Sequence, residues 1–461
     1  MSSKITLLLV ASISVLVFFI NITNYPLRNW DEAWYAEIIK NMATGTHSFL
    51  VPYWNGQYYF DKPPLYFWLS LPFFKLFGPG EWQARIVSAL SAVSASLLVY
   101  LIAKKLFGQR AGIFSTLAFL TLGQVVVRFA HGNLDALLTS LILASFYFYT
   151  NCEKNKRFAL LSGIAIGLAI LTKGWLPAMY SFLLIFAYST VTQKKLPKNL
   201  ALIIFGTFVS SFWYFLAGFI KFGKQFTDWY IFAPDAGLAR SPFSSFSLSY
   251  FKDLVRDIGA WWITIAIAAL SKIKTKKNES LIITAFTIST VLFILPLNFL
   301  SEKLGWYNLP AYSFIAIVIG LLTSKLYEKS PKLTSTIIIF VFFAQAFNVV
   351  RVENIYPDRS KIGADLGRIA KDLIPLNEKI VLDDKDFTSF LYYSNHQIVY
   401  VSLPQGGKSW EWWTIKYKDL KNFRAQKSPF WIITQRDEIL PQDRSYHTVK
   451  QHEGYKFVRF D

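Results

Sequence analysis

The chain has 461 residues, of which 53% are hydrophobic and 18% aromatic, and a formal net charge of +19 at neutral pH. Together with a mean hydropathy of +0.33, this excludes an ordinary soluble protein, because a soluble domain of this length needs far fewer apolar residues to fill its core. Lysine and arginine occur in short clusters between apolar runs, a pattern typical of membrane topology rather than of nucleic-acid binding. A single cysteine, Cys152, excludes an internal disulfide and a cysteine-based metal cluster.

Long apolar runs predict a polytopic α-helical membrane protein with about eleven transmembrane helices. The region 158–191 fits either a helix pair or one long broken helix. In chain order, the predicted spans are 4–23, 84–106, 111–129, 134–150, 158–172, 175–191, 199–220, 256–271, 281–299, 306–325 and 333–349.

The loops between these spans differ in charge. Sixteen lysines and arginines fall in short loops on the side of the N-terminus, against two, Lys173 and Lys303, in the short loops opposite. The positive-inside rule therefore predicts a cytoplasmic N-terminus in the plasma (inner) membrane, with polar segments 24–83, 221–255 and 350–461 on the extracytoplasmic face. A cleaved signal peptide is the alternative for the first span, but no small-x-small cleavage site follows it.

The first outer segment contains "RNWDEAWYAEIIKNM", in which two adjacent carboxylates, Asp31 and Glu32, follow an apolar span closely. Asn29 and Glu32 have the spacing of a capping box, and apolar residues recur at i, i+4 and i+8 from Trp34. We expect a short amphipathic helix on the outer membrane surface. The plainer interpretation is that the two carboxylates only occupy the first helical turn, where the macrodipole favours them.

Further polar side chains lie at outer ends of the predicted spans. Lys62 precedes a stiff Pro-Pro pair at headgroup level, where it suits a lipid phosphate or simply snorkels. His131 and Asp135 share a short loop, although Asp135 also fits a plain helix start. Lys303 and Tyr307 lie at another helix mouth. All of these residues are predicted to lie on one side of the membrane.

Two outer segments have no assigned chemistry. The aromatic loop 221–255 is expected to be a lid over a bound substrate, or alternatively an interfacial belt. Residues 350–461 are expected to form a small extracytoplasmic α/β domain that follows a transmembrane domain at 1–349. The runs that predict this α/β domain are a helix at "SKIGADLGRIAKDLI" and strands at "NEKIVLDD", "HQIVYVSL", "PFWIITQ" and "YKFVRF".

Several motifs together resemble the C-type glycosyltransferases of the protein O-mannosyltransferase and aminoarabinose transferase superfamily. They are "WDEAWYAEIIKNMATGTHSFLVPYWNGQYYFDKPPLYFWL", the Arg of "ARIVSALSA", "HGNLDALL", "LAILTKGWLPA" and "EKLGWYNLPAY", over roughly residues 20–325. The resemblance implies a polytopic membrane enzyme that takes a hexosyl or pentosyl unit from a polyprenyl-phosphate donor and inverts its anomeric centre. The implied partners are that donor and a lipid, glycan or protein acceptor, with no nucleic acid.

The same resemblance assigns roles to residues. Aminoarabinose transferases usually have arginine where this chain has Trp34. Arg85, Lys303 or Arg128 is therefore expected to take its place, or alternatively the donor is held differently. The sugar and the acceptor stay open. The assigned residues are Asp31, Glu32 and Asp135 as catalytic, Lys62, Arg85 and Lys303 as donor-phosphate-binding, and Tyr35, Tyr59, His131 and Tyr307 as substrate-binding.

Other functional classes fit less well. A transporter would be expected to carry ionisable residues at mid-membrane, whereas here the notable charges lie at outer helix ends. A lipid-linked oligosaccharide ligase or polymerase would not be expected to combine the Asp-Glu pair with Asp-Lys-Pro-Pro. No metal-ligand spacing occurs among the five histidines, so no metal site or cofactor is assigned, although Asp31 and Asp135 leave a divalent cation possible.

Overall fold

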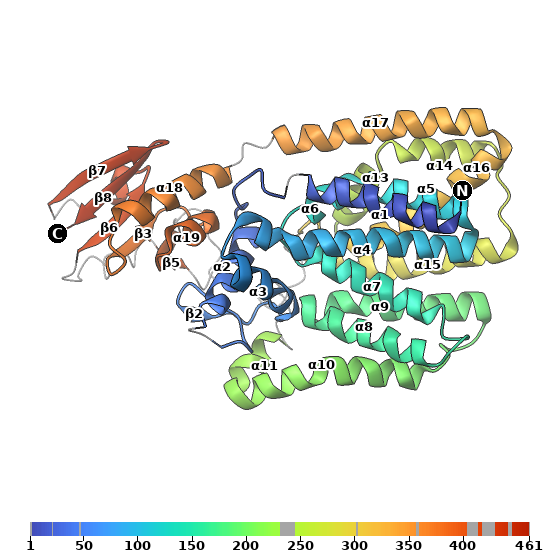
Figure 1. Ribbon diagram of the computed structural model, residues 1–461, viewed down its shortest axis with the longest axis horizontal. Coiled ribbons are helices and arrows are strands. Elements are labelled where there is room, and N and C mark those ends of the chain that lie inside the picture. Colours follow the sequence, from blue (N-terminus) through green and yellow to red (C-terminus); the bar gives the residue numbers. More distant parts are fainter. Residues whose placement is uncertain are drawn as a thin grey trace. The chain divides into compact units, whose positions relative to one another are not determined.

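The structure, a computed structural model, is described here for most of the chain (Figure 1). Two compact units make it up. The first comprises Met1–Ile22, Phe60–Ser70 and Arg85–Tyr356, and the second Thr23–Tyr59, Leu71–Ala84 and Pro357–Asp461. The described residues are 2–20, 22–45, 48–230, 245–300, 303–355, 359–402, 414–416, 429–440 and 445–460.

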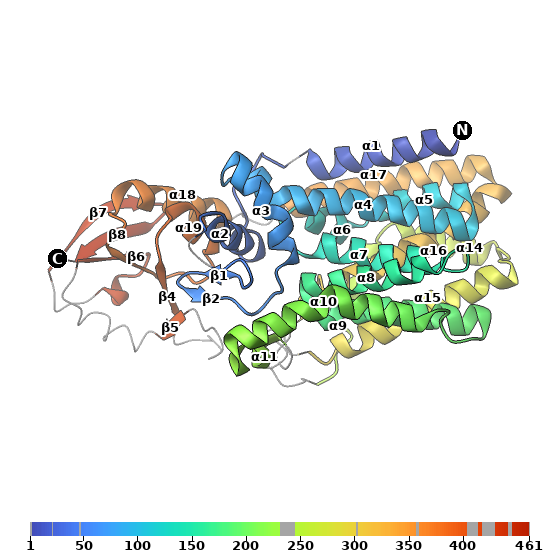
Figure 2. The ribbon, with the colours of Figure 1, turned by 60° about the horizontal axis from the view of Figure 1, so that its bottom comes forward.

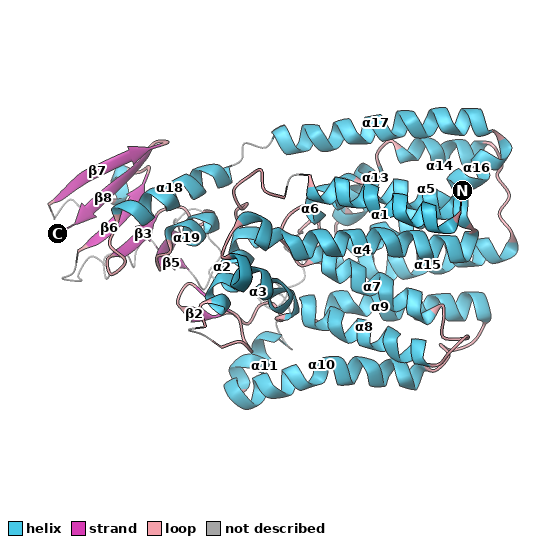
Figure 3. Cartoon of the chain, in the orientation of Figure 1, coloured by secondary structure: helices cyan, strands magenta, loops and turns pink. Residues whose placement is uncertain are grey.

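The first unit is helical, as Figure 3 shows by colour. Two helices, α3 (Leu65–Phe77) and α4 (Glu81–Phe107), belong partly to the first unit and partly to the second. The remaining helices of the first unit are α1 (Ser3–Phe19), α5 (Gln109–Phe119), α6 (Gly123–Phe129), α7 (Asp135–Tyr149), α8 (Arg157–Lys173), α9 (Trp175–Tyr188) with the π-helical turn η1 (Ser189–Gln193), α10 (Leu200–Phe222), α11 (Lys224–Tyr230), α13 (Ser249–Ile258), α14 (Trp261–Leu270), α15 (Lys277–Leu297), α16 (Leu309–Lys329) and α17 (Pro331–Ile355).

Each of the eleven predicted spans coincides with helix. Among the described residues, five helices are long and apolar enough to cross a membrane by themselves, and a sixth span results if α5 and α6 count together. These five helices are α4, α9 with η1, α10, α15 and α16. The other helices that coincide with predicted spans are shorter or do not meet the criteria of length and hydropathy.

Three of the predicted stretches differ in shape from a single straight helix. The stretch 158–191 forms the helix pair α8 and α9, separated at Gly174, whose φ of +93° suits glycine. The span 111–129 bends by 68° between α5 and α6. The span 256–271 overlaps the end of α13 and α14, which are separated at Gly259.

Glycines allow the closest helix contacts. A Cβ at Gly163 of α8 would lie 2.0 Å from the Ile203 carbonyl oxygen of α10, and one at Gly320 of α16 would lie 2.1 Å from Ser115 Oγ of α5. Side chains cannot be added there without moving a helix, as is usual where small residues bring membrane helices together. Figure 2 shows α8 and α10 side by side.

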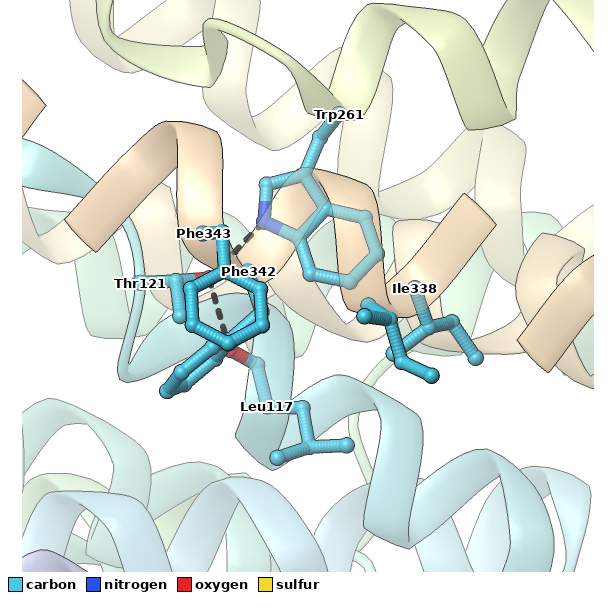
Figure 4. A pocket seen from close by; sticks show the side chains of 7 residues that line it. Leu117, Thr121, Trp261, Ile338, Phe342 and Phe343 are labelled. Carbon is cyan, nitrogen blue, oxygen red and sulfur yellow. Dashed lines mark hydrogen bonds between the residues drawn. The ribbon is translucent and has the colours of Figure 1, made fainter. Parts of the chain in front are cut away.

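A small apolar cavity of about 210 Å³ lies among α5, α14 and α17 (Figure 4). Its one buried polar pair is satisfied, because Trp261 Nε1 donates to Thr121 Oγ1 at 2.9 Å and Thr121 donates to the Leu117 carbonyl at 2.8 Å. The lining is completed by Ile338, Ile339, Phe342 and Phe343.

The second unit is built around a six-stranded mixed sheet of order β5-β4-β3-β6-β8-β7. Strands β5, β4, β3 and β6 are parallel, and β8 pairs antiparallel with both β6 and β7. The elements are α2 (Asp31–Ala43), the hairpin β1 (Tyr53–Trp54) and β2 (Gln57–Tyr58), α18 (Arg359–Leu373), β3 (Lys379–Leu382), α19 (Thr388–Ser394), β4 (Ile398–Ser402), β5 (Thr414–Lys416), β6 (Phe430–Thr434), the 3-10 turn η3 (Asp437–Ile439), β7 (Tyr446–His452) and β8 (Tyr455–Phe460).

The sequence patterns predicted the α/β class of the C-terminal segment, one helix and four strands. They missed α19, β5 and β7. Helix α19 is aromatic and short, and β7 is almost entirely exposed, so neither has the alternation that marks a half-buried strand or an amphipathic helix. The compact units also divide the chain differently from a boundary at 349, because α17 continues to Ile355 and most of the first outer segment packs with the sheet.

Candidate functional site

In the second unit, Asp31 is the first residue of α2. Its carboxylate is half-buried, and its Oδ1 accepts the Tyr35 hydroxyl at 3.4 Å. The residue before it, Trp30, has φ +67° and ψ −129°, a backbone conformation that side chains rarely adopt. Asp31 and Tyr35, each predicted as a site residue, lie one turn apart at the start of α2.

The neighbouring carboxylate, Glu32, is only 2% exposed. Its Oε2 accepts the backbone N–H of Arg28 at 2.7 Å, so it closes the turn that leads into the helix. The predicted capping box of Asn29 and Glu32 is wrong. Trp30 is the N-cap and has no side-chain cap, Glu32 accepts from Arg28, and the Asn29 side chain accepts two hydrogen bonds from Ser389.

Aromatic side chains pack against the buried face of α2. Trp34 stacks on Trp54 with ring centroids 3.8 Å apart and lies 5.8 Å from the ring of Tyr59. Trp54 in turn stacks on Tyr400 of β4 at 6.2 Å. The tryptophan that replaces the arginine usual in aminoarabinose transferases is therefore part of a core, and Tyr59 is 4% exposed beside it.

In the first unit, Asp135 is the centre of a charge cluster. Its two oxygens receive Arg128 Nε at 3.0 Å and the ammonium of Lys173. The exposed fractions of the Asp135 and Lys173 side chains are only 3% and 6%. Two cations thus converge on one carboxylate in a largely dry setting, where their interaction with it is strengthened.

Three neighbouring side chains, Asn133, Trp306 and Tyr307, pack around the Asp135 cluster. The Asn133 side chain donates to the Arg128 carbonyl and accepts the Asp135 N–H at 2.9 Å, which fixes the loop before α7. The guanidinium of Arg128 lies 4.0 Å from the centroid of Trp306, and Lys173 lies 5.2 Å from that of Tyr307. Tyr307, which the sequence placed at another helix mouth than Asp135, thus lies beside the Asp135 cluster.

Lys62 is another buried cation of the first unit. Its ammonium lies 3.2 Å from Asp61 Oδ2, and its backbone carbonyl accepts the hydroxyl of Tyr230 at 2.9 Å. Tyr230 accepts from Tyr214 at 3.1 Å, and Phe60 packs edge-on against Tyr230. The Asp-Lys-Pro-Pro turn is therefore anchored to α10 and α11.

The remaining predicted residues are Arg85, His131 and Lys303. Arg85 is 1% exposed and donates to the Ile22 carbonyl at 3.2 Å, at the end of the first predicted span. His131 follows α6 directly and is half-buried, and Lys303 is half-buried in the turn before α16. Among the described residues, no three His, Cys, Asp or Glu side chains form a group that could hold a metal ion.

Sequence reasoning missed Lys173 as a site residue. It was counted only as one of two cations in the outer loops, whereas the structure pairs it with Asp135. The signal was present, because Lys173 ends an otherwise apolar helix and precedes a glycine at positive φ. An ionisable residue there is expected to have a partner on a neighbouring helix.

The chain is similar in sequence to several known proteins. Residues 61–215 match the family model of dolichyl-phosphate-mannose-protein mannosyltransferase. An uncharacterized protein of Aquifex aeolicus is 26% identical over 317 residues, which cover 66% of this chain and 61% of that protein. The undecaprenyl phosphate-alpha-4-amino-4-deoxy-L-arabinose arabinosyl transferase of Pseudomonas savastanoi is 33% identical over 152 residues, 32% of this chain and 28% of that enzyme. The matched parts thus span less than two thirds of these relatives.

The fold has solved counterparts. ArnT from Cupriavidus metallidurans, in a crystal structure bound to undecaprenyl phosphate, matches 99% of this chain and 98% of its own with a TM-score of 0.80 at 16% identity. The Archaeoglobus fulgidus oligosaccharyltransferase matches 85% of this chain and 62% of its own with a TM-score of 0.58 at 15% identity. The chain is therefore a multi-pass α-helical membrane protein with a C-terminal sheet and the C-type glycosyltransferase fold. Within that class, the predicted resemblance to the aminoarabinose transferases is confirmed.

Proposed function

We propose that this protein is a membrane glycosyltransferase that moves a hexosyl or pentosyl unit from a polyprenyl-phosphate donor to a lipid, glycan or protein acceptor, with inversion. The observation that carries the proposal is the cluster in the first unit in which the cations Arg128 and Lys173 converge on Asp135. A leaving phosphate needs such charge. The family match over 61–215 contains this cluster and Lys62, which supports the same assignment.

The proposed reaction is a single displacement. The acceptor oxygen forms a bond to the anomeric carbon while the bond from that carbon to the phosphate oxygen breaks. The acceptor proton passes to Asp31, and the polyprenyl phosphate leaves with the bonding electron pair. Lys62 and the cations around Asp135 neutralise the phosphate, and Arg85 and Lys303 are the further candidates for that role.

The other roles follow from the same proposal. Tyr35 orients the Asp31 carboxylate through its hydroxyl, and Glu32 holds the turn before the helix. Tyr59, His131 and Tyr307 remain the candidates for contact with sugar or acceptor. If the acceptor is itself an ionised phosphate, Asp31 has no proton to take and orients the donor instead. A divalent cation is a further candidate cofactor, independent of the acceptor.

The proposed topology places the chemistry outside the cell. Eleven spans with a cytoplasmic N-terminus put segments 24–83, 221–255 and 350–461 on the extracytoplasmic face of the plasma (inner) membrane. Within 221–255, α11 and α13 are helical, and the centre of the proposed lid, 231–244, lies outside the described residues. A donor with a lipid tail stays in the bilayer, so carboxylates beside the membrane surface can reach its sugar.

A transporter and a lipid-linked oligosaccharide ligase or polymerase are the alternatives. The deciding measurement is transfer of radiolabelled sugar from a panel of polyprenyl-phosphate sugars by membranes with wild-type protein, Asp31→Asn, or the control Asp437→Asn. Asp437 makes the matched control because its side chain is 71% exposed and pairs with Lys456 at the surface. Donor consumption that disappears in Asp31→Asn alone supports the proposal. No consumption by well-expressed wild type, or equal rates in all three, refutes it.

A further inference from the structure

The turn that leads into Asp31 is bonded to the C-terminal part of its own unit. Trp30 N–H donates to Thr388 Oγ1 at 2.5 Å, and the same hydroxyl lies 3.4 Å from the Trp30 carbonyl oxygen. Asn29 N–H donates to Ser360 Oγ at 2.8 Å, and Asn29 Oδ1 accepts from Ser389 N–H at 3.1 Å and Oγ at 2.6 Å. Both peptide groups before the carboxylate thus depend on residues more than 300 positions later.

The turn needs such support because its backbone is strained. Trp30 has φ +67° and ψ −129°, a region that is almost restricted to glycine. A non-glycine residue remains there only when its surroundings hold it. Thr388 supplies that hold directly, since its hydroxyl contacts the N–H and the carbonyl of the strained residue.

The far end of α2 is bonded to the same helix, α19. Lys40 Nζ donates to the Tyr392 carbonyl at 2.8 Å and to Asn395 Oδ1 at 3.0 Å. The hairpin after α2 is attached too, because Asn55 and Ile398 exchange hydrogen bonds of 2.8 and 2.9 Å. Helix α2, which begins with Asp31, is therefore bonded near both of its ends to α19.

The sheet explains why this contact falls where it does. In the sheet, β4 and β5 lie on one side of β3, whereas β6, β8 and β7 lie on its other side. The order in which the chain adds strands therefore reverses between β3 and β6. In open α/β sheets, ligands bind outside the carboxyl ends of strands at such a reversal. Thr388 follows the carboxyl end of β3. Its described partner there is Trp30, a residue of the same chain.

We propose that the C-terminal sheet domain positions the catalytic carboxylate, with Thr388 as the main positioning residue. The inference rests on the proposed function, since it gives Asp31 the role of base. The domain holds the strained turn at Trp30, and this sets where the Asp31 carboxylate points. Misplacement of a catalytic group by about 1 Å can cost about 10²-fold in rate.

The test compares Thr388→Val, which removes the hydroxyl at nearly constant shape, with Thr388→Ser, which keeps it. In the full-length protein, Thr388→Val is expected to lower kcat for sugar transfer at least about tenfold with KM for donor within about twofold. It is also expected to speed hydrogen exchange of amides in the first turn of α2. Thr388→Ser retains wild-type behaviour in both. Unchanged kcat and unchanged exchange in Thr388→Val overturn the proposal.

Two further variants keep the test decisive. If exchange in β3 and β6 shows that Thr388→Val unfolds the sheet, Asn29→Ala tests the same turn from its other side and is expected to give the same loss of kcat. Trp30→Gly in the Thr388→Val background is expected to recover kcat, because glycine adopts that backbone without strain. If wild-type protein consumes no donor, the proposed function is refuted. Faster exchange in Thr388→Val would in that case still support the role of Thr388 in holding the turn at Trp30.

Discussion

Asp31 and Asp135 both begin a helix, yet they are held in opposite ways. Asp135 is buried and receives an arginine and a lysine directly on its two oxygens. Asp31 is half-buried, receives a tyrosine hydroxyl at 3.4 Å, and is placed mainly by the backbone turn before it. A carboxylate locked between two cations is poorly suited to accept a proton. We therefore propose that Asp135 organises charge, and base chemistry stays the proposed role of Asp31.

The largest expected effect comes from the base. Asp31→Asn keeps the shape of the side chain but cannot take a proton, so kcat is expected to fall about 10²- to 10⁴-fold. Thermal unfolding should change little, because the asparagine oxygen still accepts the Tyr35 hydroxyl. Transfer assays and thermal unfolding on the same detergent-solubilised preparation check both statements. A large loss of stability in Asp31→Asn would remove the contrast with Asp135.

The next effect tests the cluster. Lys173→Met leaves Asp135 buried with one cation fewer, and breaking a buried ion pair in this way costs about 3–5 kcal/mol. The melting temperature is therefore expected to fall clearly. In the double variant Lys173→Met with Asp135→Asn the buried negative charge is absent, so much of that stability is expected to return. A double variant no more stable than Lys173→Met would show that the pair is not what stabilises α7 and α8.

The smallest effect concerns a third carboxylate, Asp383, at the end of β3. Thr434 donates to it at 2.6 Å and Arg436 at 3.0 Å, but burial is the larger influence and raises its pKa to about 6 from the ordinary 3.8. Because the folded pKa is the higher one, protonation favours the folded state. This contribution to stability is complete below about pH 4 and is lost as the pH rises through about 6.

Hydrogen exchange measures this pH dependence in the full-length protein. After correction for intrinsic rates, amides of β3 and β6 are expected to exchange faster at pH 7 than at pH 4.5. The variant Asp383→Asn should flatten that dependence, because the titrating group is gone. The reverse slope in the wild type would mean that Arg436, rather than burial, dominates the pKa of Asp383.

The apolar runs predicted where helices lie, because lipid allows few alternatives to a helix for a long apolar segment. They did not predict the 68° bend between α5 and α6, since hydrophobicity carries no information on direction. Single positions such as Asp31 were found from motifs within one segment. Lys173 and Thr388 were not, because their partners lie 38 and 358 positions away and no local pattern links them.

That separation of 358 positions between Trp30 and Thr388 also has a consequence for biosynthesis. The segment that carries Asp31 leaves the ribosome long before the residues that hold it are made. It cannot reach its final form until most of the chain has been translated and inserted, since its hydrogen-bond partners do not yet exist. We therefore expect completion of the chain to switch on activity, so that unfinished copies in the membrane stay inert toward a reactive donor.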